Sequence, residues 1–272
     1  MLIDGKKMAE ELKTSLASEV FKLSKKPRLA VIRVGGDPVT EKFMEQKKKF
    51  GGAVGIDVRI YNIEDDITTS KLREKVSEIV HIEENTGVII QLPLPKQINT
   101  QYILDAITPE KDPDMLSSKS IGLFSSGRSK ILPPVVGAID HIFTAYGIQL
   151  KAKKVVVLGV GRLVGKPAAI WLINHGATVT AIDENTDDPT LYTVNADIII
   201  SGVGMPHLIG ADMVKDGVIA IDCGTSEANG KLAGDMDPAV AEKASLFTPV
   251  PGGVGPLSVA MLFKNLVELA KR

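Results

Sequence analysis

The stretch VVVLGVGRLVGKPAA, Val155 to Ala169, decides the fold of the chain. A short apolar run rich in valine leads into it, three glycines follow, and a helical pattern leaves it from Ala168 to Asn174. A buried strand, a tight turn and a helix in direct succession are typical of the parallel βαβ unit. The stretch therefore predicts a parallel sheet covered by helices.

The three glycines also predict a ligand. Their spacing, G-x-G-x-x-x-G, is one residue longer than the common dinucleotide fingerprint. The first suits a tight turn, the second lets the backbone approach a pyrophosphate, and the third lets helix and strand pack closely. The free N–H groups at the helix start favour a phosphate. The cofactor-binding residues predicted in this turn are Gly159, Val160, Gly161, Arg162, Leu163 and Gly165.

Two alternatives to a dinucleotide site stay open at this point. A tight strand-to-helix turn can have no ligand at all. An ATP-type phosphate loop is disfavoured, because Pro167 stands where a Ser or Thr would coordinate magnesium and because the glycine spacing differs.

Later strands of the same half strengthen the dinucleotide interpretation. The strand predicted at 177–182 ends in Asp183, about twenty residues beyond the glycines, where a carboxylate accepts hydrogen bonds from the adenosine ribose. A carboxylate there repels a 2′-phosphate, so the sequence favours NAD over NADP. The strand at 197–201 is followed by small residues that leave room for a nicotinamide ribose. The further cofactor-binding residues predicted are Gly202, Val203, Gly204 and Thr225.

The rest of the chain alternates in the same way, which predicts an α/β protein of two domains. In the first half we expect helices at 5–25, 39–54 and 69–83, strands at 28–34, 58–61 and 87–92, and a loop-rich segment from Pro109 to Val136. In the second half we expect a helix at 134–146, strands at 154–158, 177–182, 197–201 and 217–222, and a last helix at 256–271. The predicted domains are 1–140 with 255–272, and a Rossmann-like, doubly wound domain at 141–254. The last helix is expected to return to the first domain.

Composition excludes several function classes. The 272 residues carry 32 basic and 33 acidic side chains, so nothing predicts a nucleic-acid surface. Cys223 is the only cysteine and the four histidines share no ligand spacing, so no disulfide framework and no metal site is predicted. The polar N-terminus is not a signal peptide and no apolar run reaches membrane-spanning length, so we expect a soluble, cytoplasmic protein.

The first half has its own candidates for chemistry. Gln91 is the polar residue near the end of a buried strand, Lys47 lies on a predicted helix, and the segment PEKDPD brings carboxylates on a loop. A second loop, TPVPGGVGP at 248–256, is rigid and has little side chain. Taken singly, each has an ordinary structural explanation, such as a strand cap, a solvated face or a connector.

Together these motifs resemble the bifunctional methylenetetrahydrofolate dehydrogenase/methenyltetrahydrofolate cyclohydrolase family. The resemblance covers nearly the full chain in the family's order: GGDPVTEKFMEQKKK, GVIIQLPLP, ITPEKDPD, GRLVGKP and TPVPGGVGPLSVAML. It implies oxidation of methylene-tetrahydrofolate with a nicotinamide, hydrolysis of methenyl- to formyl-tetrahydrofolate, folate bound between the domains, and a homodimer. The family's catalytic positions fall on Lys47, Gln91 and Asp114. The substrate-binding residues implied are Phe43, Lys47, Gln91, Leu92, Pro93, Asp114, Pro251, Gly252 and Gly253.

The implied residues suit the implied chemistry. Hydride transfer needs no acid or base, so positioning dominates that step. Hydrolysis needs an activated water, and a desolvated lysine has a lowered pKa and can move the proton. Gln91 would hold the amine of Lys47, and Asp114 would accept hydrogen bonds from the pterin.

The sequence also departs from the family pattern. Phe43 stands where the family has tyrosine; if the tyrosine hydroxyl orders the lysine or a water, we expect the hydrolase activity to be reduced more than the dehydrogenase activity. Met115 and Ser117 replace the glycine and histidine of the family's KDVDGFH, and the segment at 133–136 lacks the family's Cys and Thr. Val160 and Gly161 replace an Arg and a Ser suited to a 2′-phosphate, which again favours NAD. The altered segments leave two alternatives: a dehydrogenase of another substrate, and a non-catalytic protein that binds nucleotide or folate.

Overall fold

The computed structural model describes residues 1–36, 38–228 and 231–271, and within them the side chains except those at 38–40, 42–43, 227–228 and 231. The chain divides into two compact units. The three-stranded unit comprises Glu10–Pro134 and Val259–Arg272, and the five-stranded unit comprises Met1–Ala9 and Val135–Ser258. The predicted domain limits differ from these units at 1–9, 135–140 and 255–258.

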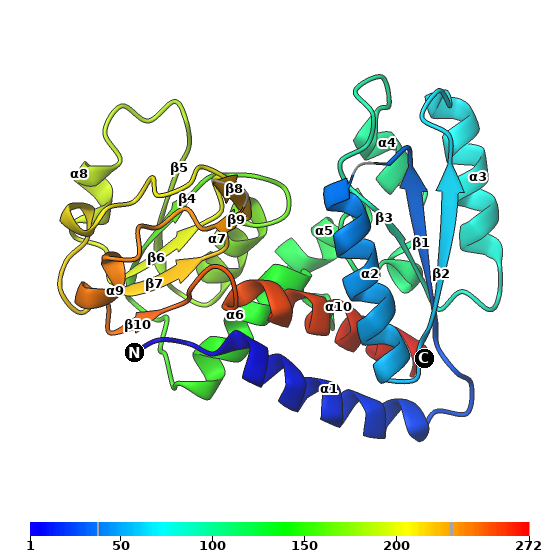
Figure 1. The fold of residues 1–272 in the computed structure, drawn as a ribbon, viewed down its shortest axis with the longest axis horizontal. Coiled ribbons are helices and arrows are strands. Elements are labelled where there is room, and N and C mark those ends of the chain that lie inside the picture. The colour runs from blue at the N-terminus through cyan, green and yellow to red at the C-terminus, as the bar shows by residue number, and fades with distance from the viewer. Residues whose placement is uncertain (37, 229–230, 272) are drawn as a thin grey trace. The chain divides into compact units, whose positions relative to one another are not determined.

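The three-stranded unit is a parallel sheet with helices on both faces (Figure 1). Its strands lie in the order β2-β1-β3, and both neighbours of β1 run parallel to it. The strands are β1 (Arg28–Val34), β2 (Asp57–Ile63) and β3 (Gly87–Ile90). The helices that pack on it include α1 (Gly5–Phe21), α2 (Pro38–Ala53), α3 (Thr69–His81) and α4 (Thr100–Leu104).

Alternation along β1 sorts its side chains into two cores, because successive residues of a strand point to opposite faces. Leu29 and Val31 pack with α1, α2 and the last helix, α10 (Val254–Ala270). Ala30 and Ile32 pack with α3 and α4 on the other face. With both faces covered, the strands are near-continuous apolar runs, as parallel sheets require.

The five-stranded unit is also a parallel sheet, in the order β10-β7-β6-β4-β5. Its strands are β4 (Lys154–Leu158), β5 (Thr178–Ile182), β6 (Ile198–Ser201), β7 (Ile219–Asp222) and β10 (Leu246–Phe247). A separate hairpin, β8 (Ser226–Ala228) and β9 (Lys231–Ala233), follows β7. The helices are α6 (Pro134–Ala145), α7 (Gly165–Asn174), α8 (Thr190–Thr193) and α9 (Val240–Lys243).

Strand β4 is the topological switch of this sheet. The chain leaves β4 for β5 on one side and then crosses to β6 on the other side. In doubly wound sheets ligands bind outside the carboxyl ends of the strands at this point. The glycine turn follows β4 directly, so the fold places it where such a ligand binds.

The predicted fold class is confirmed: the protein is α/β, with two parallel sheets. The return of the last helix is confirmed as well, because Leu262, Phe263 and Leu266 belong to the core of the three-stranded unit. The ring of Phe263 stacks on Phe50 of α2, with centroids 5.1 Å apart. Within the part of the chain that the structure describes, no helix is long and apolar enough to span a bilayer.

The segment from Pro109 to Val136 is less irregular than predicted. It contains a single 3₁₀ turn (Pro109–Lys111) and the eight-residue helix α5 (Ser118–Ser125). The serine-rich composition pointed to a loop, but Ser117 caps α5 by accepting a hydrogen bond from the Ser120 N–H. The hairpin β8–β9 and the two-residue strand β10 were not predicted either, since neither is long enough to produce an apolar period.

Candidate active site

Lys47 and Gln91 form the first part of the candidate site. Lys47 lies on α2 and Gln91 directly follows β3, and the Lys47 Nζ donates to the Gln91 Oε1 at 2.7 Å. The Gln91 Nε2 donates to the Leu92 carbonyl at 2.9 Å, which turns the amide oxygen toward the lysine. The structure thus brings together two residues that the sequence predicted to work as a pair.

Asp114 completes the pair electrostatically. Burial raises the pKa of Asp114 to about 6. The Lys47 ammonium opposes this rise, and the Asp112 carboxylate adds to it. Burial also lowers the pKa of Lys47, and the Asp114 carboxylate partly offsets this. The pKa values of both groups are shifted toward neutral pH, as is common where side chains move protons.

The loop that carries Asp114 is anchored on both sides of it. The Lys111 Nζ donates to the carbonyls of Val80 and Ile82 at the end of α3, at 2.6 and 2.8 Å. The buried Asp112 carboxylate accepts from the backbone N–H groups of residues 116 and 117, at 3.3 and 2.9 Å. These contacts fix the backbone before and after Asp114.

Asn265 of α10 and Met115 hold the same loop. The Asn265 Nδ2 donates to the carbonyls of Pro113 and Leu132 at 2.8 and 2.7 Å. Met115 has a φ of 61°, a left-handed backbone that glycine adopts without strain. The loop therefore has at this position the backbone that glycine favours, although the residue is a methionine whose side chain is buried.

The other predicted folate-binding residues are less informative. The side chain of Phe43 lies outside the described residues. Leu92 packs against the core beside α3, and Pro93 is exposed. In the five-stranded unit, the Gly253 N–H donates to the Pro249 carbonyl at 2.7 Å, Gly252 has a φ of 109°, and Pro251 is exposed. Their contacts with a substrate stay predictions.

The glycine turn has the geometry that its spacing indicates. Gly159 has a φ of 82°, and its N–H donates to the Ile182 carbonyl at 2.8 Å. A Cβ on Gly165 would lie 1.6 Å from the Gly159 carbonyl oxygen, so α7 packs against the turn at glycine distance. A Cβ on Gly161 would meet no atom within 4 Å. The packing of the fold thus requires the third glycine, whereas the second faces open space and its contact with a nucleotide stays a prediction.

The loop after β6 lies directly beside this turn. A Cβ on Gly159 would come 2.7 Å from the Gly202 carbonyl oxygen, so the two backbones are in contact. Gly204 has a φ of 81°, and Val203 is half-buried. The predicted cofactor residues of the two loops therefore come together at the switch point of the sheet.

The remaining predicted cofactor residues lie near the same sheet edge. Asp183 directly follows β5, and its Oδ1 accepts from the Asn185 N–H at 3.0 Å. Arg162, Leu163 and Thr225 are exposed, and Val160 is half-buried. Their contacts with a nucleotide stay predictions.

Sequence reasoning missed two buried carboxylates in this unit, Asp222 and Asp235. Asp222 ends β7, and Asp235 follows β9. Both are buried, and both accept hydrogen bonds from backbone N–H groups. The available signal was Asp222 at the end of the apolar run of β7, together with Asp235, the first aspartate of the segment GDMD.

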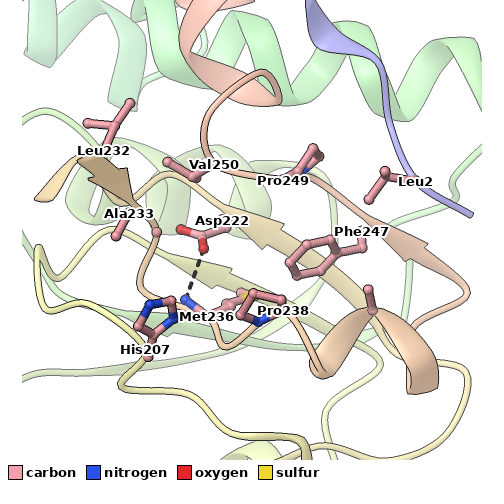
Figure 2. A pocket seen from close by; sticks show the side chains of 12 residues that line it. Leu2, His207, Asp222, Leu232, Ala233, Met236, Pro238, Phe247, Pro249 and Val250 are labelled. Carbon is pink, nitrogen blue, oxygen red and sulfur yellow. Dashed lines mark hydrogen bonds between the residues drawn. The ribbon is translucent and has the colours of Figure 1, made fainter. Parts of the chain in front are cut away.

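A pocket of about 540 Å³ adjoins Asp222 (Figure 2). Its lining is mostly apolar and includes Leu2, Phe247 and Val250, and His207 and Asp222 add polar atoms. The hydrogen bond from the Met236 N–H to Asp222, 2.9 Å long, lies at its wall. None of the predicted site residues lines this pocket.

Comparison with known proteins decides the family. The model of the tetrahydrofolate dehydrogenase/cyclohydrolase catalytic domain matches residues 3–114, and that of the family's NAD(P)-binding domain matches residues 133–272. The chain belongs to the tetrahydrofolate dehydrogenase/cyclohydrolase family. The resemblance seen in the sequence motifs is thereby confirmed.

Individual members of the family match along the whole chain. A bifunctional protein FolD of Nautilia profundicola is 44% identical over 278 residues, covering 99% of this chain and 97% of the relative. The crystal structure of bifunctional FolD from Campylobacter jejuni has a TM-score of 0.97 at 36% identity, and covers 100% and 98% of the two chains. A FolD structure from Trypanosoma brucei, complexed with NADP and an inhibitor, has a TM-score of 0.94 at 31% identity, and covers 100% and 97%.

The residues around the glycine turn fit a bound NAD(P), the nucleotide that the family's second domain is named for. A Cβ on Gly161 would meet no atom of the described chain within 4 Å, so a phosphate group can come close to the backbone there. The neighbouring turn at Gly159 and the loop at Gly202 expose backbone rather than large side chains. In the described residues, no cluster of three or more His, Cys, Asp or Glu side chains could hold a metal ion.

Proposed function

We propose that the protein oxidises methylenetetrahydrofolate to methenyltetrahydrofolate with a nicotinamide cofactor, and hydrolyses methenyl- to formyltetrahydrofolate. Membership of a family named for both activities supports this proposal. The observation that carries it is the 2.7 Å contact between the Lys47 Nζ and the Gln91 Oε1, beside a carboxyl whose pKa is about 6.

In the oxidation, the chain positions the reactants. A nicotinamide cofactor, held at the glycine turn and the loop from Gly202 to Gly204, would supply the acceptor for the hydride of the one-carbon unit. Asp114 accepts hydrogen bonds from the N–H donors of the pterin, for which it must be ionised, as it is above about pH 6. Lys111, Asp112 and Asn265 keep this carboxylate in place by fixing its loop. Correct placement of two reactants supplies much of the rate of such a step.

In the hydrolysis, Lys47 moves the proton. Its lowered pKa makes the neutral amine more accessible, so the Nζ can take a proton from the attacking water and return it later. The Gln91 oxygen accepts a hydrogen bond from the Nζ in either protonation state and keeps it in position. The Asp114 carboxylate opposes the fall of the pKa of Lys47 and so tunes the amine.

The deciding experiment measures the two activities separately. Wild-type protein should reduce a nicotinamide cofactor with methylenetetrahydrofolate and should consume methenyltetrahydrofolate without any cofactor. In Lys47→Met the hydrolysis should fall by at least about 100-fold, the lower range for loss of a general acid–base, while some hydride transfer is retained. The matched control is Lys48→Met, which removes an exposed neighbour on the same helix. Unchanged hydrolysis in Lys47→Met would contradict the role of this lysine.

We also propose that NAD is the preferred cofactor. Asp183 directly follows β5, and a carboxylate at that point of a dinucleotide-binding unit accepts hydrogen bonds from the adenosine ribose and repels a 2′-phosphate. Initial rates with each cofactor should give a higher kcat/KM for NAD, and Asp183→Ser should reduce that preference. A wild-type preference for NADP would overturn this proposal and leave the two activities untouched.

Phe43 and the assembly state complete the proposal. Without the tyrosine hydroxyl the hydrolase is the weaker activity, so Phe43→Tyr should raise hydrolysis relative to oxidation. A similar ratio in both proteins would contradict this reading. We further propose a homodimer in the cytoplasm. Light scattering coupled to gel filtration should give twice the mass of the 29.1 kDa chain.

A further inference from the structure

Asp235 is a buried acid with an unusual set of partners. None of its surface is exposed, and no salt bridge reaches it from the described residues. Its Oδ2 accepts from the Ser201 hydroxyl and from the Val203 N–H, both at 2.7 Å. Its Oδ1 accepts from the N–H groups of Gly204 and Met205, at 2.9 and 3.1 Å. One carboxylate therefore binds the end of β6 and three successive backbone N–H groups after it.

Those N–H groups belong to the loop that borders the glycine turn. The Gly202 carbonyl oxygen would lie 2.7 Å from a Cβ on Gly159, so a displacement of this loop changes the surface beside the glycine turn. The N–H groups of Val203, Gly204 and Met205 point to Asp235, and the carbonyl of the preceding Gly202 lies against Gly159 of the turn. The shape of the loop is thus set by a side chain that is 32 residues beyond Val203 in the sequence.

Asp222 holds Asp235 in turn. It accepts from the Gly224 N–H at 2.8 Å, from the Asp235 N–H at 3.1 Å and from the Met236 N–H at 2.9 Å. The adjoining backbone has no room for side chains. A Cβ on Gly224 would lie 2.4 Å from the Asp235 Oδ1, and one on Gly234 would lie 2.1 Å from the Asp222 Oδ2.

We infer that Asp235 is a positioning residue for the nicotinamide dinucleotide: by holding the loop from Gly202 to Met205 it sets nucleotide affinity without touching nucleotide or folate. The inference rests on the proposed function in assuming that the nucleotide lies on this loop. All four partners of Asp235 are donors, so only a carboxylate satisfies them together. An amide in its place turns an N–H₂ group toward N–H groups of the loop.

The test compares Asp235→Asn with Asp237→Asn in the full chain. Asp237 is two residues away and accepts from the Ala239 N–H, which an asparagine oxygen can also do. In Asp235→Asn the dissociation constant for NAD or NADP, measured by calorimetry, should rise by about 10- to 100-fold, the range for leaving buried donors unpaired. Hydrolysis of methenyltetrahydrofolate should stay within about twofold, since it needs no nucleotide. Asp237→Asn should resemble wild type in both measurements.

Trp171 reports whether the five-stranded unit is folded, because it is the only tryptophan and lies buried on α7. Its emission maximum should be the same in wild type and Asp235→Asn. If that variant does not fold, Ser201→Ala removes one donor and keeps the carboxylate, and nucleotide affinity should still fall by about threefold, as for a single lost hydrogen bond.

Three outcomes would overturn the inference. The first is unchanged nucleotide affinity in a folded Asp235→Asn, or in Ser201→Ala where that variant replaces it. The second is an equal loss of nucleotide binding and hydrolysis with unchanged Trp171 emission. The third is a wild-type chain that binds neither NAD nor NADP, which would also contradict the nicotinamide cofactor of the proposed function. A wild-type chain that binds nucleotide but does not oxidise methylenetetrahydrofolate would overturn the proposed function alone, and the affinity comparison would still support or reject the role of Asp235.

Discussion

Each unit holds two ionisable side chains beside its predicted ligand site, and the two pairs are built differently. Lys47 and Asp114 have opposite charges and shift each other's pKa, and burial moves both away from their ordinary values. Asp222 and Asp235 have the same charge and are buried, yet seven hydrogen bonds from the chain satisfy them. Burial raises the pKa of Asp222, and the N–H groups that it accepts from oppose the rise.

The difference separates two uses of buried charge. In the three-stranded unit the charged groups themselves are predicted to contact the substrate, and Lys47 is predicted to change protonation. In the five-stranded unit the carboxylates face the backbone and give it a shape, and the backbone then faces the predicted nucleotide. Burial alone does not distinguish a proton-transfer group from a structural one; the number of donors already bound to it does.

The largest expected effect comes from Asp114→Asn. We expect the KM for folate to rise by about 100-fold, because the variant loses a charged acceptor for the pterin, a loss of about 1.5–3 kcal/mol. The rising limb of the hydrolysis pH profile, where Lys47 loses its proton and becomes a base, should move to lower pH, since the carboxylate no longer raises the pKa of Lys47. Steady-state kinetics across pH measure both. Nucleotide affinity should not change, and a parallel loss of it would break the comparison.

The second prediction concerns stability and pH. Asp114 has a pKa of about 6 in the folded chain and about 3.9 when unfolded. Between these values the folded state binds the proton more tightly, so the free energy of unfolding falls as the pH rises from about 4 to about 6. The fall due to this group is about 3 kcal/mol.

Urea unfolding followed by circular dichroism at several pH values measures this fall in the free energy of unfolding. Asp114→Asn should lack this part of the fall, and Glu110→Gln, an exposed acid on the same loop, should keep it. Parallel stability curves for Asp114→Asn and wild type would mean that Asp114 titrates near its ordinary pKa.

The third prediction tests the anchor of the Asp114 loop. Asn265→Ala leaves the buried carbonyls of Pro113 and Leu132 without their donor, which should cost about 2 kcal/mol of unfolding free energy. Hydrolysis should fall by about tenfold with the loop displaced. Thermal unfolding and the hydrolysis rate measure the two effects, with Lys264→Ala as the exposed control. Lower stability with an unchanged rate would assign Asn265 to the fold alone.

The sequence alone was sufficient to predict the elements with a regular apolar pattern. The apolar runs at β1 and β4 predicted both strands to the residue, because both faces of a parallel sheet are buried. The glycine turn was legible for a similar reason, since close packing at Gly165 admits no other residue. Lys47, Gln91 and Asp114 were predicted from the family motifs, since periodicity alone would have left Lys47 on a solvated face.

The supporting contacts were out of reach because they join distant residues. Asn265 is 152 residues from Pro113, and Asp235 is 34 residues from Ser201. An acid that accepts backbone N–H groups leaves no spacing rule in the sequence, because its partners are amides that every residue except proline has. Helix α5 was missed for a local reason: it has eight residues, begins after a serine cap and contains several serines and a glycine.

The smallest change in stability is expected at Gly161, and it tests the view that the five-stranded unit binds through its backbone. A Cβ there meets no atom, so Gly161→Ala should leave the unfolding free energy within about 0.5 kcal/mol of wild type. The same methyl group would occupy the space where a pyrophosphate is predicted to approach, so the nucleotide dissociation constant should rise by about tenfold. Calorimetry and urea unfolding measure the two quantities. Gly165→Ala is the contrasting variant, because its Cβ would lie 1.6 Å from the Gly159 oxygen and should destabilise the unit. If Gly161→Ala bound nucleotide as tightly as wild type, the ligand would lie elsewhere on the sheet edge, and the contrast between a side-chain site and a backbone site would fail.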